Sequence, residues 1–321
     1  MPAAAQSVLA LSGGVGGAKL ALGLADCLPA EALAVLVNTG DDFTHLGLHI
    51  SPDIDTLLYT LSGRNNETLG WGLAGESWQA MDALEQLGGE TWFRLGDRDL
   101  ATHLWRTQAL ASGKTLSDVT GMLAQRMGID CAVYPMSDDP VRTIVHSPAG
   151  DLSFQHYFVK HQCEPQVSGF AFDGIAAASP NAEVMSLINS GQLAGVVICP
   201  SNPFVSVDPI LQLPGMYEAL SRLEVPVIAV SPIVAGMAIK GPAAKMMAEL
   251  NMPVTAQAVA EHYTQRYPGL LDCFVIDQSD VTLGADIRST GIDVAVTNTI
   301  MKTRAEKQTL AQYILQMIGR D

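Results

Sequence analysis

The sequence is poor in charged residues, and poor in basic ones above all. Of 321 residues only 16% are charged, and 18 Lys and Arg stand against 33 Asp and Glu, so the formal net charge is −15. An average soluble chain is about 25% charged. Binding to a nucleic-acid backbone needs a basic face, and a polybasic membrane-surface protein needs clustered Lys and Arg. We therefore expect neither nucleic acid nor a membrane as a partner.

Long hydrophobic runs and paired cysteines are also missing. The apolar stretch Val225–Ile239 is interrupted by Pro226 and Pro232, and it is shorter than the roughly 18–20 residues of a membrane span. The first seven residues contain no basic segment, so we expect no signal peptide. The five cysteines are scattered and never form a C-x-x-C pair. This spacing is typical of reduced thiols in a cytoplasmic protein and does not support a zinc-finger site.

Hydrophobic residues, in contrast, make up 48% of the chain and suffice for a large core. Uniformly apolar segments alternate with helical patterns, which predicts a parallel sheet covered on both faces. No linker or internal repeat divides the chain. We therefore predict one α/β domain over residues 1–321, with a doubly wound, mostly parallel, Rossmann-like sheet and an inserted smaller subdomain. The predicted sheet strands are Val8–Leu11, Ala34–Val37, Cys131–Pro135, Gly195–Cys199, Val225–Val230, Cys273–Ile276 and Asp293–Val296.

The inserted region is expected at about 64–128, where all four tryptophans fall within residues 71–105. Residues 64–92 have an irregular pattern, and helical periodicity returns over Ala101–Leu110 and Leu116–Met127. A β-hairpin is expected at about 141–160, with strands over Thr143–His146 and Ser153–Val159. Ligands of a doubly wound sheet bind beyond the carboxyl ends of its strands. The polar loops that follow the predicted strands are therefore the candidate site.

A glycine loop follows the first predicted strand and precedes a predicted helix. Its residues are Ser12, Gly13, Gly14, Val15, Gly16 and Gly17. Glycines allow close approach of a phosphate, and the helix N-terminus behind them offers free N–H groups. The loop is neither the dinucleotide fingerprint, because Lys19 replaces the third glycine, nor a P-loop, because no Gly-Lys-Ser/Thr follows. It is either a phosphate or nucleotide site or a tight strand–helix turn.

The charges around this loop favour a metal-assisted phosphate site. Lys19 is the only Lys or Arg in the first 63 residues, which also contain Asp41, Asp42, Asp53 and Asp55. These carboxylates would repel a phosphate unless a cation lay between them, and Mg²⁺ suits both kinds of oxygen ligand. Each Asp taken singly is also a good helix cap or turn residue.

Other polar groups admit two interpretations each. Arg94 and Arg98 are candidate anion clamps, but the segment Gly96–Asp99 can equally form a surface ion-pair cluster. The tryptophans can stack on a planar ligand or pack an irregular insert. His45 and His49 lack a third metal ligand, so we interpret them as loop residues or as residues that support a site without binding its ligand. Asn202 can donate to a ligand or cap the next turn.

Together these motifs resemble one family, the 2-phospho-L-lactate transferases (CofD type) of coenzyme F420 biosynthesis. The similarity extends in order through nearly the whole chain, and its most specific stretch is Leu95–His103. The matching segments are Ser12–Gly17, Asn38–Asp42, Ser51–Thr56, Gly70–Gly72, Leu95–His103, Ser137–Pro140, Pro200–Pro203 and Val230–Ile233.

The resemblance implies a reaction. A guanosine diphospho-activated three-carbon acid donates its phospho-acid group to the ribityl hydroxyl of the deazaflavin Fo, GMP leaves, and (dehydro)coenzyme F420-0 forms. The donor acid could be phospholactate, phosphoenolpyruvate or a phosphoglycerate, and the sequence does not distinguish them. The resemblance also implies a Mg²⁺ cofactor and a homodimer.

The resemblance also implies roles for particular residues. Asp41 and Asp55 are expected to bind Mg²⁺, and Asp55 and Arg94 to contact Fo. Arg98 is the expected phosphate clamp, so that Asp41, Asp55 and Arg98 form the catalytic set. The donor is expected to be held by Ser12, Gly13, Gly14, Gly16, Gly17 and Asn202.

Two rival functions make different predictions. A glycine loop also fits the gluconeogenesis-factor (YvcK-like) proteins, which would make this chain a non-catalytic regulator that binds a nucleotide or sugar nucleotide. The stretch Leu95–His103 speaks against that class. A nicotinamide-dependent oxidoreductase is disfavoured by the broken fingerprint at Lys19.

Overall fold

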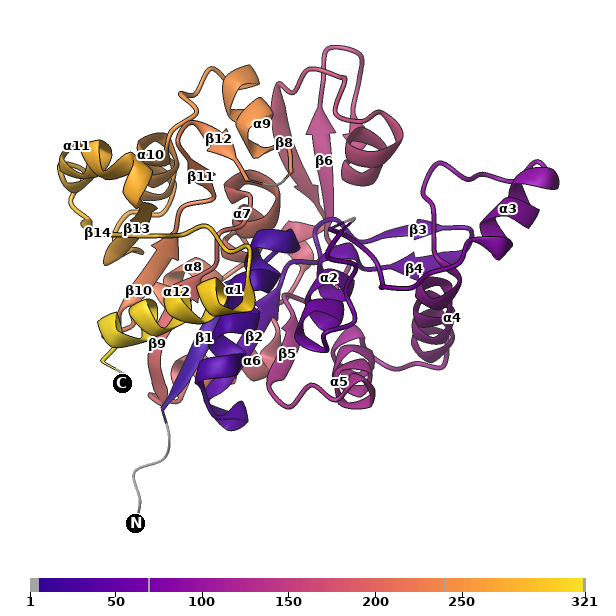
Figure 1. Cartoon of the computed structure of the whole chain (residues 1–321), viewed down its shortest axis with the longest axis horizontal. Coiled ribbons are helices and arrows are strands. Elements are labelled where there is room, and N and C mark those ends of the chain that lie inside the picture. Colours follow the sequence, from indigo (N-terminus) through magenta and orange to yellow (C-terminus); the bar gives the residue numbers. More distant parts are fainter. Residues whose placement is uncertain (1–5, 69, 240, 320–321) are drawn as a thin grey trace.

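A computed structural model describes residues 6–68, 70–239 and 241–319. A parallel sheet of seven strands lies at the centre (Figure 1), in the order β14-β13-β10-β9-β1-β2-β5. The predicted doubly wound, mostly parallel sheet is confirmed. Its strands are β1 (Ser7–Ser12), β2 (Leu33–Val37), β5 (Ala132–Pro135), β9 (Leu193–Ile198), β10 (Val227–Val230), β13 (Cys273–Asp277) and β14 (Asp293–Thr297).

The inner strands are apolar throughout because both faces of the sheet are buried. Successive side chains of a strand point to opposite faces. On β1, Leu9 and Leu11 belong to one apolar cluster, whereas Val8 and Ala10 belong to the other. A polar residue at any of these positions would lie in a core.

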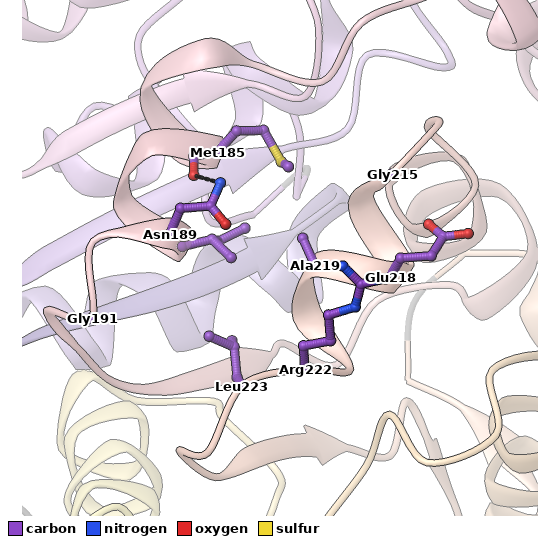
Figure 2. A pocket seen from close by; sticks show the side chains of 9 residues that line it. Met185, Asn189, Gly191, Gly215, Glu218, Ala219, Arg222 and Leu223 are labelled. Carbon is purple, nitrogen blue, oxygen red and sulfur yellow. Dashed lines mark hydrogen bonds between the residues drawn. The ribbon is translucent and has the colours of Figure 1, made fainter.

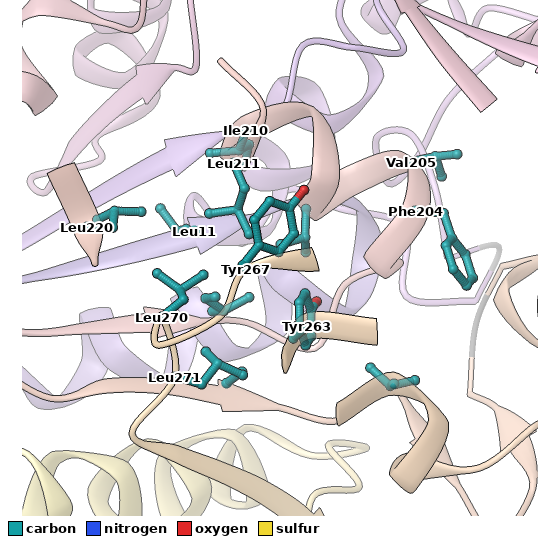
Figure 3. Packing of buried hydrophobic residues seen from close by; sticks show 14 of the residues in the cluster. Leu11, Phe204, Val205, Ile210, Leu211, Leu220, Tyr263, Tyr267, Leu270 and Leu271 are labelled. Atoms are coloured by element: carbon teal, nitrogen blue, oxygen red, sulfur yellow. The ribbon is translucent and has the colours of Figure 1, made fainter. Parts of the chain in front are cut away.

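Helices cover each face of the sheet. Part of the first core is drawn in Figure 3, where Leu11 of β1 lies among residues of α7, α8 and α10. That core is covered by α6 (Ala182–Asn189), η4 (Pro203–Val207), α7 (Asp208–Leu211), α8 (Met216–Leu220), α9 (Ala243–Glu249), α10 (Ala256–Arg266) and α11 (Gly284–Arg288). The opposite core is covered by α1 (Gly14–Cys27), α2 (Pro52–Leu61), α5 (Leu116–Met127) and α12 (Arg304–Met317).

The strand order has a switch point between β1 and β9. From β1 the chain adds β2 and then β5 on one side, whereas β9, β10, β13 and β14 follow on the other side. The loops after β1 and β9 therefore leave the sheet at the same edge, at the switch point where such sheets bind ligands.

A small subdomain projects from the edge of this sheet (Figure 1), beside α2 and α4. It contains the hairpin of β3 (Phe43–His45) and β4 (Leu48–Ile50), α3 (Gln79–Gln86) and the start of α4 (Asp97–Ala111). Ile50, Met81 and Leu95 form its own apolar cluster. The expectation that residues 64–92 are irregular is wrong where α3 forms. Most of the exposed α3 is polar, and only Met81 is buried, so its apolar pattern is weak.

A second, antiparallel sheet has the order β7-β6-β8, formed by β6 (Arg142–His146), β7 (Leu152–Ser153) and β8 (Gly169–Asp173). The strand expected over Ser153–Val159 is wrong beyond Ser153, because residues His156–Lys160 form the π-helical turn η2. Phe154 and Tyr157 are both buried. Positions three apart share a face of a helix but lie on opposite faces of a strand, so burying both rings favours the helical turn.

The remaining short elements connect these layers. They are η1 (Ala30–Ala32), η3 (Ile175–Ala177), the hairpin of β11 (Ile233–Val234) and β12 (Met237–Ala238), and η5 (Gln278–Leu283). Within the described ranges, no helix is both long and apolar enough to cross a membrane.

Candidate active site

The glycine loop lies at the switch point, between β1 and the first turn of α1. The Gly13 N–H donates to Ser201 Oγ at 3.1 Å, and the Gly14 N–H donates to Asp53 Oδ1 at 2.7 Å. Gly14 has a φ of +64°, a conformation that glycine adopts without strain. A carboxylate thus sits at the N-terminus of α1, where the helix dipole and free N–H groups stabilise an anion.

Close packing against the loop after β9 explains two of the glycines. A Cβ on Gly16 would lie 2.2 Å from the carbonyl oxygen of Pro200, and one on Gly17 would lie 2.7 Å from Ser201 Oγ. Both distances are far shorter than a van der Waals contact. The sequence Gly16-Gly17 therefore lets the loops after β1 and β9 meet directly.

Three buried aspartates gather beside this loop. Asn38, at the end of β2, connects two of them: its Nδ2 lies 3.2 Å from Asp41 Oδ1 and 3.0 Å from Asp53 Oδ2. The third, Asp42, accepts hydrogen bonds from Ser51 Oγ at 2.8 Å and His49 Nε2 at 3.1 Å. The loop after β2 and the start of α2 thus converge on the glycine loop, as their positions after strands predict.

The electrostatics of this group are unfavourable without a cation. Burial, together with the charges of Asp53 and Asp42, raises the pKa of Asp41 well above its ordinary value. Burial raises the pKa of Asp53 to about 6, although hydrogen bonds from Asn38 and Gly14 oppose the shift. Asp42 Oδ1 is buried and has no hydrogen-bond partner. An unpartnered carboxylate oxygen in this setting is suited to a metal ion.

The carboxylates alone do not complete a metal centre. Across the described residues, no group of three or more His, Cys, Asp or Glu side chains is arranged to hold a metal ion. Mg²⁺ commonly uses one or two carboxylates and takes its other ligands from water and substrate phosphates. One or two of Asp41, Asp42 and Asp53 could act in that mode, since they lie beside the glycine loop at the N-terminus of α1.

Asp55 faces away from this cluster. Both of its carboxylate oxygens are bound by Arg106 of α4: Nη1 donates to Oδ2 at 3.1 Å, and Nη2 donates to Oδ1. The Arg106 side chain is fully buried. The two expected metal ligands thus differ in their surroundings. The carboxylate of Asp55 is bound by Arg106, whereas that of Asp41 lies in the acidic cluster formed by Asp41, Asp42 and Asp53.

The two expected arginine clamps lie on the inserted subdomain. Arg94 is exposed, pairs with Asp82 at 2.8 Å and lies 5.3 Å from the ring centre of Trp78. Arg98 is exposed and donates to the Ala74 carbonyl at 3.1 Å. Both side chains have subdomain partners, whereas Asp41 and Asp53 lie at the glycine loop. The roles expected of these arginines stay predictions.

Asn202 begins η4 beside the glycine loop. Its Oδ1 accepts from the Phe204 N–H at 3.0 Å, and its Nδ2 lies 3.3 Å from Met246 Sδ. In this structure it therefore has the capping role, one of the two alternatives the sequence allows. Its neighbour Ser201 is the residue of this loop that binds Gly13.

Gln155 is a site residue that the sequence does not reveal. Its Nε2 lies 3.4 Å from Asp41 Oδ2, across 114 residues of chain. The next residue, His156, stacks on Trp92 with ring centres 4.7 Å apart. The turn η2 thus joins the antiparallel sheet to both the acidic cluster and the inserted subdomain. Trp92 packs within the protein here, as the second interpretation of the tryptophans expected.

A surface pocket of about 490 Å³ lies at the opposite edge of the sheet. Figure 2 shows it between α6 and α8, with Arg222 and Glu218 on one side and Met185 and Asn189 on the other. It is near the amino ends of β9 and β10, and none of the predicted site residues lines it. The glycine loop and the three aspartates lie at the other edge.

Three comparisons place this fold and sequence among known proteins. A family model described as 2-phospho-L-lactate transferase CofD matches residues 8–311. The chain is 37% identical over 308 residues to a protein of Methanosarcina acetivorans named 2-phospho-L-lactate transferase, covering 96% of this chain and 98% of that protein. It is 39% identical over 290 residues to a protein of Streptomyces griseus named phosphoenolpyruvate transferase, covering 89% of this chain and 90% of that protein.

A solved structure shares the fold. A member of the UPF0052 family from Bacillus halodurans aligns with a TM-score of 0.65, at 15% sequence identity, over 97% of this chain and 98% of its own. At that identity the likeness concerns the arrangement of the sheet and its helices alone.

Proposed function

This chain belongs to the CofD family of 2-phospho-L-lactate transferases, and from that premise we propose that Fo is its acceptor and a guanosine diphospho-activated acid its donor. The acceptor's ribityl oxygen forms a bond to the phosphorus that carries the three-carbon acid. The bridging P–O bond of the diphosphate breaks, and GMP leaves with the bridging oxygen. The hydroxyl proton is released, and the product is a phosphodiester.

One observation carries this proposal: groups that favour an anion and groups that favour a cation lie side by side at the switch point. The N-terminus of α1 and the glycine loop favour an anion. One of their N–H groups, that of Gly14, donates to Asp53 Oδ1 at 2.7 Å. Next to them, Asp42 offers an unpartnered buried oxygen that favours a cation. A diphosphate donor with its divalent cation satisfies both.

We propose that one or two of the carboxylates of Asp41, Asp42 and Asp53 would hold Mg²⁺. When bound, the metal would neutralise charge that develops on the diphosphate and the leaving GMP. Metal ligation by Asp55, which the resemblance implies, stays a prediction, and we favour the other three aspartates because Arg106 engages both Asp55 oxygens.

The chain's own groups would position the reactants. The loop N–H groups, Ser12 and Asn202 would orient the diphosphate, and Ser201 holds the glycine loop through Gly13. Asp55 and Arg94 are the proposed acceptor contacts, on the side of the inserted subdomain. Holding both substrates in line can itself supply much of the acceleration.

The proposal does not specify which three-carbon acid the donor carries. One relative is named for 2-phospho-L-lactate and another for phosphoenolpyruvate, at 37% and 39% identity. The experiment must therefore offer guanosine diphospho-activated phospholactate, phosphoenolpyruvate and phosphoglycerate in parallel.

The test begins with a fluorescence titration of Fo, with and without GDP and Mg²⁺. We expect saturable Fo binding that GDP and Mg²⁺ modify, and then GMP release and a new phosphodiester, identified by mass spectrometry, with at least one donor. Asp41→Asn should abolish transfer, whereas the exposed Asp286→Asn on α11 should leave it unchanged. Binding of nucleotides or sugar nucleotides without any affinity for Fo would overturn the proposal in favour of a regulator. Light scattering would test the proposed homodimer.

A further inference from the structure

Arg106 is a fully buried arginine on α4, and its guanidinium contacts residues of α2, β4 and α4. Besides the two Asp55 oxygens, its Nη1 lies 3.4 Å from the His49 carbonyl oxygen and 3.2 Å from His103 Nδ1. Burial alone would lower the pKa of Arg106, but the charge and hydrogen bonds of Asp55 raise it overall. The guanidinium is therefore a permanent cation.

This arrangement is costly, which indicates a purpose beyond stability. Removing an arginine and a carboxylate from water costs several kcal/mol for each ion, and an apolar pair of the same volume is often as stable. In addition, Arg106 Nε is buried with no hydrogen-bond partner. What the pair supplies is a fixed geometry for one carboxylate.

A second layer of contacts holds Arg106 in turn. Because a guanidinium only donates, the facing His103 Nδ1 must carry a lone pair, which places the ring proton on Nε2. That Nε2 lies 3.3 Å from Asp99 Oδ1, and the same oxygen accepts from the Tyr59 hydroxyl at 2.5 Å. Tyr59 lies on α2 with Asp55, so side chains of both helices surround Arg106, although His103 Nε2 itself makes no hydrogen bond.

The helix geometry separates Asp55 from the acidic cluster. Two positions along an α-helix are rotated by about 200°. Asp53 therefore points to the glycine loop, where it binds Gly14, while Asp55 points to α4 and Arg106. An ionised carboxylate has about four acceptor positions, and a bidentate arginine uses two of them. The others remain for a hydroxyl group.

We propose that Arg106 is a positioning residue that sets the role of Asp55. It fixes the carboxylate plane and neutralises its charge, so that Asp55 accepts a hydrogen bond from a hydroxyl of the acceptor substrate and does not bind the metal. This inference rests on the proposed function, because it takes Asp55 as an acceptor contact.

The experiment compares Arg106→Met and Arg106→Lys with Arg126→Met, an exposed arginine of α5 that serves as control. Losing a charge-assisted hydrogen-bond arrangement should raise both the Kd of Fo without Mg²⁺ and the KM for Fo by about tenfold in Arg106→Met. Arg106→Lys should recover part of this loss. In the Arg106 variants, the donor KM and the half-saturating Mg²⁺ concentration should stay within about twofold of the wild-type values. In Arg126→Met, these two quantities should also stay within about twofold of wild type.

Three results would overturn the inference. A lower melting temperature with unchanged Kd and KM for Fo would reduce Arg106 to a structural role. A large rise in half-saturating Mg²⁺ would make Asp55 a metal ligand. If the changes in the Kd and KM for Fo caused by Asp55→Asn and Arg106→Met multiply in the double variant, Arg106 acts independently of Asp55. We expect instead that the double variant matches Asp55→Asn alone.

The double variant also guards against misfolding, because it removes both buried charges together. If Arg106→Met does not fold, the comparison uses Arg106→Lys and the double variant, with the same expected pattern. Failure of the proposed function is distinguishable: wild-type protein that neither binds nor converts Fo overturns both proposals. Wild-type turnover with an unaffected Arg106→Met overturns the positioning role alone.

Discussion

Asp41, Asp42 and Asp53 share a buried space in which their negative charges oppose one another. Asn38 donates to two of them, and Asp42 keeps one oxygen without a partner. The three carboxylates that we propose as cation ligands therefore lower the stability of the ligand-free protein. Such a cost can be measured through its dependence on pH.

We predict that Asp53 contributes a loss of stability to the ligand-free protein as pH rises. The pKa of Asp53 is raised by burial from 3.8 to about 6. Between these values the unfolded chain has released a proton that the folded chain still holds, so stability is full below the unfolded pKa and is lost as pH rises through about 6. For Asp53 alone the loss is of the order of 3 kcal/mol.

Urea unfolding at about pH 5 and about pH 7.5 tests this linkage. Asp53→Asn keeps an oxygen that can accept the Gly14 N–H but cannot ionise, so its stability should fall less over the same range. Equal pH dependence in wild type and variant would contradict the assigned shift.

Gly16 is a second residue whose role is local, because a side chain there would meet the Pro200 carbonyl at 2.2 Å. We predict that Gly16→Ala displaces one of the two loops, destabilises the protein and abolishes GDP binding, measured by calorimetry. Gly121 in α5 is the matched control, since a Cβ there would have nothing within 4 Å. Gly121→Ala should leave GDP binding intact and stabilise the helix by about 0.5–1 kcal/mol.

At the scale of elements, α3 and α4 cap each other. The Glu76 carboxylate, just before α3, accepts from the Arg98 and Asp99 N–H groups of α4 at 2.9 and 2.8 Å. Asp97 of α4 accepts from the Gln79 and Ala80 N–H groups of α3, both at 3.1 Å. This exchange explains why the stretch Leu95–His103 has acids and a glycine at its start. A Cβ on Gly96 would collide with the Glu76 carboxyl group.

We therefore predict that Glu76→Ala costs about 1 kcal/mol of stability, the usual effect of losing a helix cap. Amide hydrogen exchange at Arg98 and Asp99 should accelerate with it. The control is Glu85→Ala, an exposed glutamate of α3, which should change neither. Unchanged exchange in Glu76→Ala would mean that the first turn of α4 does not depend on this cap.

The sequence predicts an element well where its apolar residues follow one clear pattern. The inner sheet strands are apolar on both faces, and α5 begins and ends where the pattern of Leu116–Met127 does. The mostly exposed α3 has little apolar signal. The segment Ser153–Val159 alternates like a strand, but the burial of Phe154 and Tyr157 on one side decides for a helical turn.

The site is predictable to the extent that it follows strand ends. Ser12–Gly17 and Asp41 come together because parallel strands deliver their carboxyl ends to one edge, and Asp53 joins them from the first turn of α2. Gln155 and Arg106 are not predictable, because each reaches its aspartate from an element far along the chain. No local pattern encodes such a contact.

At the scale of the whole molecule, two opposite demands meet at the switch point, so the ligands should stabilise the protein jointly. A ligand that binds only the folded state at a hundred times its Kd adds about 2.7 kcal/mol. We predict that GDP with Mg²⁺ raises the melting temperature by more than the sum of either alone. Asp42→Asn should remove the Mg²⁺-dependent part. Equal stabilisation by GDP with and without Mg²⁺ would contradict a metal bridging protein and donor.

The position of β1 has a consequence for the newly made protein. This strand lies between β2 and β9, so one of its two edges finds its partner only when residues 193–198 have been synthesised. Likewise α1 packs on α12, and Gly23 lies where a Cβ would meet the Lys307 carbonyl at 2.2 Å. An unpaired apolar strand is a template for aggregation. A nascent chain paused midway would thus carry an open edge at its centre, and chaperones should associate with it until β9 leaves the ribosome.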